Sequence, residues 1–125
     1  MLAALAAWNA REVLGFAFVA RDDDINLIFN PNLGPPSSPS LAWMFTDAAY
    51  MRRYVPLGWL AFSEVYAFSG LSPTGYHAAT LAFHAINTLL AFAVLLALVR
   101  RFGSPVGDGW QTTAAAAGAA LWSLH

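Results

Sequence analysis

The sequence of 125 residues contains no cysteine and no lysine. The missing cysteines exclude disulfides, thiolate catalysis and zinc–thiolate sites, and the missing lysines exclude Schiff-base chemistry. Charge of either sign is scarce: charged residues make up 10% of the chain, and its formal net charge is −1. Because no basic surface is available, we expect no binding of nucleic acid.

Apolar residues are correspondingly abundant. They make up 58% of the chain, above the roughly 45–50% typical of soluble proteins. The mean hydropathy is +0.53. The composition therefore predicts a membrane protein. Together with the order of apolar runs and helix breakers described below, it leads us to expect an all-α fold, a helical transmembrane protein with a large external loop that bears short interfacial helices.

The apolar runs divide this single partial membrane domain into five segments. Residues 76–99 are predicted to form a transmembrane helix, because about 20 mostly apolar residues cross a bilayer. Arg100 and Arg101 follow it and place its end in the cytoplasm by the positive-inside rule. We expect a partial spanning helix over 1–20, an external loop over 21–75, a cytoplasmic turn over 100–110 and the start of another spanning helix over 111–125. One complete span between two incomplete ones predicts a fragment of a larger protein.

The predicted external loop is rich in helix breakers and aromatic residues. Four prolines between residues 30 and 40 disfavour both helix and central strand. Ser40 is then the expected N-cap of a short helix. The aromatic segment Leu57–Phe68 is too short to span a membrane, so we expect it either to lie in the interface plane, as part of an aromatic belt, or to pack on the loop.

Three consecutive carboxylates, Asp22, Asp23 and Asp24, stand out in a chain with so little charge. Adjacent like charges repel unless solvent, a cation or a substrate relieves the repulsion. Three interpretations stay open: a catalytic or substrate-positioning site, a solvated loop that caps a helix, and a binding site for a divalent cation such as Mg²⁺ or Mn²⁺.

Polar residues also form a stripe on the predicted spanning helix. His77, Thr80, His84 and Asn87 follow at spacings of three, four and three, which places them on one helix face. Buried polar groups need partners, so we expect this face to line a bundle interior or a water-accessible cavity. Packing through interhelical hydrogen bonds and contact with a substrate are both open. Haem ligation is disfavoured, because a single helix cannot supply both axial faces.

An ordered set of short motifs extends over nearly the whole chain. In order, they are Phe18-Val19, Asp22-Asp23, Asn30-Pro31, Leu41-Ala42-Trp43-Met44-Phe45, Tyr54-Val55-Pro56-Leu57, Gly75-Tyr76-His77, Phe83-His84-Ala85 and Ala119-Ala120-Leu121-Trp122-Ser123-Leu124-His125. The set resembles the N-terminal part of membrane glycosyltransferases related to protein O-mannosyltransferases. More narrowly, it resembles those with a C-terminal tetratricopeptide-repeat domain.

This resemblance implies a C-type glycosyltransferase fold and a role for each candidate residue. Asp22 and Asp23 correspond to the family's acidic pair, which acts as general base on the acceptor hydroxyl or positions it. Arg52 and Arg53 lie in the loop that binds the donor phosphate, although they would equally suit lipid headgroups. The further expected substrate-binding residues are Asp24, His77 and His84. No metal site is assigned and no cofactor is certain, and a divalent cation remains an alternative.

The function implied is transfer of a mannose-like hexose from a polyprenyl- or dolichyl-phosphate sugar to a hydroxyl, on protein or glycan. The expected location is the bacterial inner membrane, with the acidic loop facing the periplasm. Because enclosing a lipid donor takes further helices, we expect no turnover from these 125 residues alone. The alternative is a small non-catalytic membrane protein that acts through helix–helix association.

Overall fold

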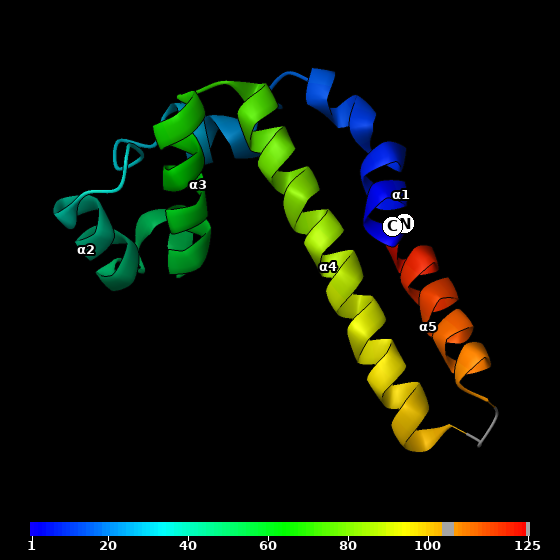
Figure 1. Cartoon of the computed structure of the whole chain (residues 1–125). Coiled ribbons are helices and arrows are strands. Elements are labelled where there is room, and N and C mark those ends of the chain that lie inside the picture. Colours follow the sequence, from blue (N-terminus) through cyan, green and yellow to red (C-terminus); the bar gives the residue numbers. More distant parts are fainter. Residues whose placement is uncertain (104–106, 125) are drawn as a thin grey trace. The chain divides into compact units, whose positions relative to one another are not determined.

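The computed structural model describes residues 1–103 and 107–124. All secondary structure in this part of the chain is helical (Figure 1), which confirms the all-α prediction for it. The elements are α1 (Leu2–Asn9), η1 (Arg11–Gly15), η2 (Asp24–Ile28), α2 (Ser38–Thr46), η3 (Tyr50–Arg52), α3 (Pro56–Ser69), α4 (Pro73–Phe102) and α5 (Asp108–Ser123).

The chain divides into two compact units. Met1–Val13 and Thr80–His125 form one, here called the helical unit, and Leu14–Ala79 form the other, here called the loop unit. Helix α4 contributes to both, because the division falls between Ala79 and Thr80.

Helix α4 has the length and hydropathy that a membrane-spanning helix needs. Its 30 residues include an 18-residue window with a mean hydropathy of 2.2, of which only 6% is buried within the structure. Among the described residues, it is the one helix long and apolar enough to cross a bilayer. It begins at Pro73, a residue suited to a first helical turn, and ends on Arg100 and Arg101, whose charges favour a helix C-terminus.

The N-terminal segment differs from the prediction of a partial spanning helix over residues 1–20. Helix α1 ends at Asn9, and the Arg11 guanidinium donates a hydrogen bond of 2.7 Å to the carbonyl of Trp8 in its last turn. The chain then continues as the short 3-10 helix η1 and leaves helical structure after Gly15. The polar residues that interrupt the apolar run therefore end the helix instead of lying within it.

The helical unit packs through small side chains. Helices α1 and α5 are in contact, and the fully buried residues on them are Ala6, Ala115 and Ala119. Gly118 faces α4, where a Cβ atom would lie 2.9 Å from the Leu95 side chain. Small residues allow such close approach between helices.

The segment between α4 and α5 lies partly outside the described residues. The predicted turn over 100–110 includes residues 104–106, which lie outside the described residues. Residue 125, at the end of the helix predicted over 111–125, also lies outside them. Where the structure is described, α4 extends to Phe102 and α5 begins at Asp108.

Helix α2 begins with a capping box, but not at the predicted residue. Ser37 is the N-cap: its hydroxyl accepts a hydrogen bond from the backbone N–H of Ser40, and the Ser40 hydroxyl accepts one from the N–H of Ser37. Ser40 was expected to be the N-cap. It is instead the third helical residue, whose side chain bonds back to the N-cap residue in a capping box. Pro39 within the first turn lacks an N–H that would have needed a partner.

The core of the loop unit is aromatic. Trp59 on α3 is 3% exposed and packs against Trp43 of α2, with ring centroids 5.4 Å apart, and against Tyr50, at 5.7 Å. Phe62 continues the cluster, 6.1 Å from Trp59. Of the two alternatives for segment 57–68, Trp59 therefore follows packing on the loop and not the interfacial belt, whereas Phe68 at the end of α3 is 89% exposed.

A charge placed at the centre of α4 tests its role as a membrane span. We expect Leu90→Arg to reduce insertion strongly, because arginine costs about 3 kcal/mol at the middle of a spanning helix. Leu90 is exposed in the structure, so lost core packing does not explain such an effect. Insertion into microsomes would be measured with glycosylation tags, and Leu57→Arg, at an exposed position of α3, is the control. Equal insertion of both variants would contradict the assignment.

Candidate functional site

Two of the three carboxylates bind backbone N–H groups close to them in the sequence. Residues 21–30, here called the acidic turn, contain the π-helical turn η2. Asp23 Oδ2 accepts a hydrogen bond of 2.8 Å from the N–H of Val19. Asp24 Oδ1 accepts from the N–H groups of Arg21, at 3.0 Å, and Ile25, at 2.8 Å. These two aspartates therefore hold the backbone at the entry to the turn, whereas Asp23, the N-cap residue of η2, makes no side-chain capping hydrogen bond.

Asp22 differs from its two neighbours. Its side chain is exposed, and no residue in the described part of the chain forms a hydrogen bond or ion pair with it. An ionised carboxylate with free oxygens can accept a proton or a hydrogen bond from a ligand. Of the three acids, Asp22 thus has the carboxylate that is chemically available.

The end of the acidic turn is built around Asn30, which is 6% exposed. Its amide nitrogen donates to the carbonyl of Asn26, at 3.2 Å, and its side-chain oxygen accepts from the N–H of Asn32, at 3.0 Å. The backbone of Pro31 has no N–H to offer to Asn26. The Asn30 side chain supplies that missing donor, which gives the Asn-Pro pair a structural role.

Two side chains from the segment around η3 reach the acidic turn. The Tyr50 hydroxyl donates to the carbonyl of Ile25, at 2.7 Å, and Arg53 Nη2 donates to the side-chain oxygen of Asn26, at 2.8 Å. Burial raises the pKa of Tyr50 above its usual 10.0, although the charge of Arg53 partly opposes the shift. The hydroxyl therefore remains protonated, and able to donate, at neutral pH.

Backbone conformations that L-residues rarely adopt occur on both sides of this junction. Arg21 enters the acidic turn with φ of 115°, and Met51 and Arg52 have φ of 54° and 53°. Such conformations cost about 1–3 kcal/mol each and persist where surrounding contacts over-determine them. They are found preferentially at functional sites, which makes this junction the leading candidate site of the loop unit.

The two predicted arginines play different parts at this junction. Arg53 is bound to Asn26, as described above. Arg52 is exposed, and its guanidinium has no partner among residues 1–103 and 107–124. The structure thus brings Arg53 to the acidic turn and leaves the Arg52 guanidinium available.

The predicted histidines lie in different units. His77 belongs to the loop unit, with its ring centroid 6.5 Å from that of Phe18, and its Nε2 atom is buried without a hydrogen-bond partner. His84 belongs to the helical unit, where Nε2 lies 3.1 Å from the carbonyl oxygen of Ser123 and the ring stacks on Trp122. The contacts of His84 fit the interpretation of interhelical packing. Asn87, farther along the predicted stripe, is exposed.

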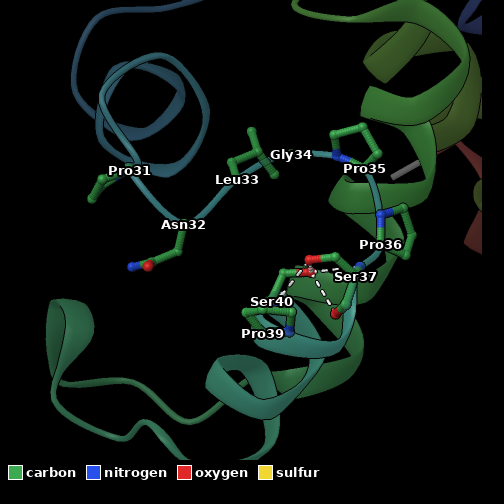
Figure 2. A pocket seen from close by; sticks show the side chains of 9 residues that line it. All are labelled: Pro31, Asn32, Leu33, Gly34, Pro35, Pro36, Ser37, Pro39 and Ser40. Carbon is green, nitrogen blue, oxygen red and sulfur yellow. Dashed lines mark hydrogen bonds between the residues drawn. The ribbon is translucent and has the colours of Figure 1, made fainter.

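A concavity of about 540 Å³ lies in the proline-rich loop that follows the acidic turn. Figure 2 shows the side chains that surround it, all drawn from this loop and the first turn of α2: Pro31, Asn32, Leu33, Gly34, Pro35, Pro36, Ser37, Pro39 and Ser40. Ser63 of α3 donates a hydrogen bond to the carbonyl of Gly34 and so ties the loop to the aromatic core. The lining carries no charged residue, and the hydroxyls of Ser37 and Ser40 are already paired with each other.

No metal-binding arrangement is present in the part of the chain that the structure describes, since no three histidine, aspartate or glutamate side chains converge. The acidic turn instead combines one available carboxylate, Asp22, with the Arg53 guanidinium, which is bound to Asn26 of the same turn. Such a combination can take up a proton and bind an anionic oxygen.

No family model, curated protein or solved structure matches the chain. The acidic turn and its contacts are therefore the basis for assigning a function.

Two residues that shape the candidate site were not predicted. Tyr50 and Asn26 connect η3 to the acidic turn, yet they lie 24 positions apart in the sequence. A tyrosine near an arginine pair and an asparagine near an acidic run are each common patterns. Their partnership depends on how the chain folds between them.

Loss of the Tyr50 hydroxyl should loosen the acidic turn. We expect Tyr50→Phe to increase hydrogen exchange across residues 24–30, because it removes a hydrogen bond worth about 1 kcal/mol. Tyr54→Phe is the matched control, since the Tyr54 hydroxyl donates to the carbonyl of Phe45 instead. Hydrogen-exchange mass spectrometry measures both variants. Unchanged exchange across the acidic turn in Tyr50→Phe would contradict the role assigned to this hydroxyl.

Proposed function

We propose that the chain forms the acidic loop and flanking helices of a membrane glycosyltransferase similar to the protein O-mannosyltransferases. The proposed reaction moves a mannose-like hexose from a polyprenyl- or dolichyl-phosphate sugar to an acceptor hydroxyl. The observation that carries the proposal is the difference between the three aspartates: Asp23 and Asp24 bind backbone N–H groups, whereas Asp22 is exposed and has no partner among the described residues.

In this proposal, Asp22 is the general base. Its carboxylate accepts the proton of the acceptor hydroxyl while the oxygen attacks the anomeric carbon of the sugar. A new carbon–oxygen bond forms, and the bond from the anomeric carbon to the phosphate oxygen breaks. The polyprenyl phosphate leaves with that electron pair. Asp23, tied to Val19, and Asp24, tied to Arg21, position the turn from which Asp22 projects.

The leaving phosphate needs a cation, and Arg52 suits this role. A guanidinium group offers two parallel N–H donors that match phosphate oxygens. Arg53 is engaged with Asn26, so its part is to position the turn. The guanidinium of the adjacent residue, Arg52, has no partner in the described part of the chain, which supports assigning it to the donor phosphate.

The lipid donor requires a membrane domain, and α4 is the candidate span within it. We propose that the full fold has several such spans. By the positive-inside rule, Arg100 and Arg101 at the end of α4 face the cytoplasm. The acidic turn would then face the periplasm of a bacterial inner membrane.

One observation favours a second candidate function. Only 6% of the apolar window of α4 is buried within the structure. An apolar helix surface of this kind is covered by lipid or by other helices. The alternative is therefore a small non-catalytic membrane protein that associates through α4.

Substitution of the proposed base distinguishes Asp22 from its neighbours. In membranes that contain the larger enzyme of which this chain is proposed to be a part, we expect Asp22→Asn to lower hexose transfer from the polyprenyl-phosphate sugar by about 10²- to 10⁴-fold, the usual contribution of a general base. Asp24→Asn is the matched control, because asparagine keeps an oxygen that can accept from Arg21 and Ile25. Transfer of radiolabelled hexose measures the rate.

Retained transfer in Asp22→Asn would refute the assignment of the base. Absence of transfer in the unsubstituted protein, with a band of 13.4 kDa in an immunoblot of source membranes, would favour the non-catalytic alternative. A much larger band would direct the transfer assay to that larger protein.

A further inference from the structure

The helical unit contains a second cavity, of about 320 Å³, which the proposed reaction does not use. It lies where the end of α1, the first half of α4 and the end of α5 meet. Apolar side chains, among them Val13 and Leu81, provide much of its wall. The polar lining residues are Asn9, Thr80, His84 and Ser123. A mostly apolar cavity with a few convergent polar groups is typical of a small-molecule site.

The contacts of His84 define what its ring offers to the cavity. Its Nε2 atom lies 3.1 Å from the Ser123 carbonyl oxygen. A carbonyl oxygen can only accept, so Nε2 carries the hydrogen of this bond. In the neutral ring, Nδ1 is then left with a free lone pair. The stacking of the ring on Trp122, with centroids 5.3 Å apart, limits its rotation.

The Thr80 hydroxyl differs in its hydrogen bonding from other threonines on the helices of this chain. Thr88 and Thr113 each donate to the carbonyl four residues earlier in their own helix, both at 2.9 Å. The Thr80 hydroxyl makes no such bond, and neither it nor the side-chain amide of Asn9 has a partner in the described residues. Three polar residues with unused hydrogen-bonding capacity, Thr80, Asn9 and His84, therefore line the same cavity.

We propose that this cavity binds a neutral molecule with a hydroxyl group and an apolar body. The lining has no residue that carries a fixed charge, which disfavours an ionic ligand. The hydroxyl donates to His84 Nδ1 and accepts from Thr80, and the apolar body contacts Val13 and Leu81. At about 30 Å³ per water-sized group, the cavity has room for about ten non-hydrogen atoms.

Two sources offer this chemistry: a free alcohol and the hydroxyl-bearing headgroup of a neutral membrane lipid. The site does not depend on the acidic turn, because every lining residue belongs to the helical unit. The proposal can therefore succeed or fail independently of glycosyl transfer.

The test compares two isomers of equal size. The full chain, in lipid nanodiscs, is titrated with n-hexanol and separately with methyl n-pentyl ether, which lacks a hydrogen-bond donor. The imidazole nitrogen resonances of His84, assigned by their loss in His84→Gln, report binding. We expect saturable shifts with n-hexanol and an affinity for the ether that is about tenfold lower, because the ether leaves Nδ1 unpaired.

Substitutions in the cavity provide the control. Thr80→Val keeps the shape of the side chain and should weaken n-hexanol binding by about three- to tenfold. Thr113→Val, which removes a hydroxyl outside the cavity, should leave the affinity for n-hexanol unchanged. Ala10→Leu should abolish binding, because Ala10 lines the cavity and a larger side chain fills it.

Shifts that do not saturate, that are equal for alcohol and ether, or that are the same in Thr80→Val and Thr113→Val would each overturn the proposal. Nanodiscs that contain monoolein separate the two sources. Competition between monoolein and n-hexanol identifies a lipid hydroxyl as the ligand, and saturable n-hexanol binding without such competition identifies a free alcohol.

Discussion

Two side-chain hydrogen bonds, from Tyr50 to Ile25 and from Arg53 to Asn26, connect the two segments on which the candidate site depends. Neither segment is stabilised by a long helix of its own: one is a π-helical turn, and the other is a three-residue 3-10 turn with positive φ angles. Each bond satisfies an acceptor of the acidic turn. The aromatic cluster supports the arrangement, because the Tyr50 ring also packs against Trp59 of the core.

This arrangement gives three adjacent aspartates different chemical roles. Binding to backbone N–H groups uses the oxygens of Asp23 and Asp24 and directs their charge toward the peptide dipoles. Asp22 has no such partner in the described structure and keeps its carboxylate exposed. A structural role of Asp23 and Asp24 is therefore compatible with a catalytic role of Asp22. The two roles apply to different residues of the same turn.

The helical unit follows a different principle. Its buried contacts are made by alanines on α1 and α5 and by the close approach of Gly118 to Leu95 of α4. Small side chains allow helices to pack without a large apolar core. The polar bond between His84 and Ser123 links α4 to the end of α5, and the cavity beside it remains unfilled by side chains.

The sequence by itself determined the features that depend on local composition. Apolar run length identified α4, the capping serines and prolines marked the start of α2 to within three residues, and the three consecutive carboxylates located the acidic turn. Each of these follows from residues close together in the chain, where propensity and periodicity operate.

Tertiary structure decided the features that depend on residues far apart. It placed Trp59 in a core, because rings from α2 and η3 surround it. It brought Tyr50 to Ile25 and separated the surroundings of His77 and His84 although both lie on one helix. The physical reason is that a hydrogen bond or a ring contact needs a partner at a particular distance. Only the folded path of the intervening chain sets that distance.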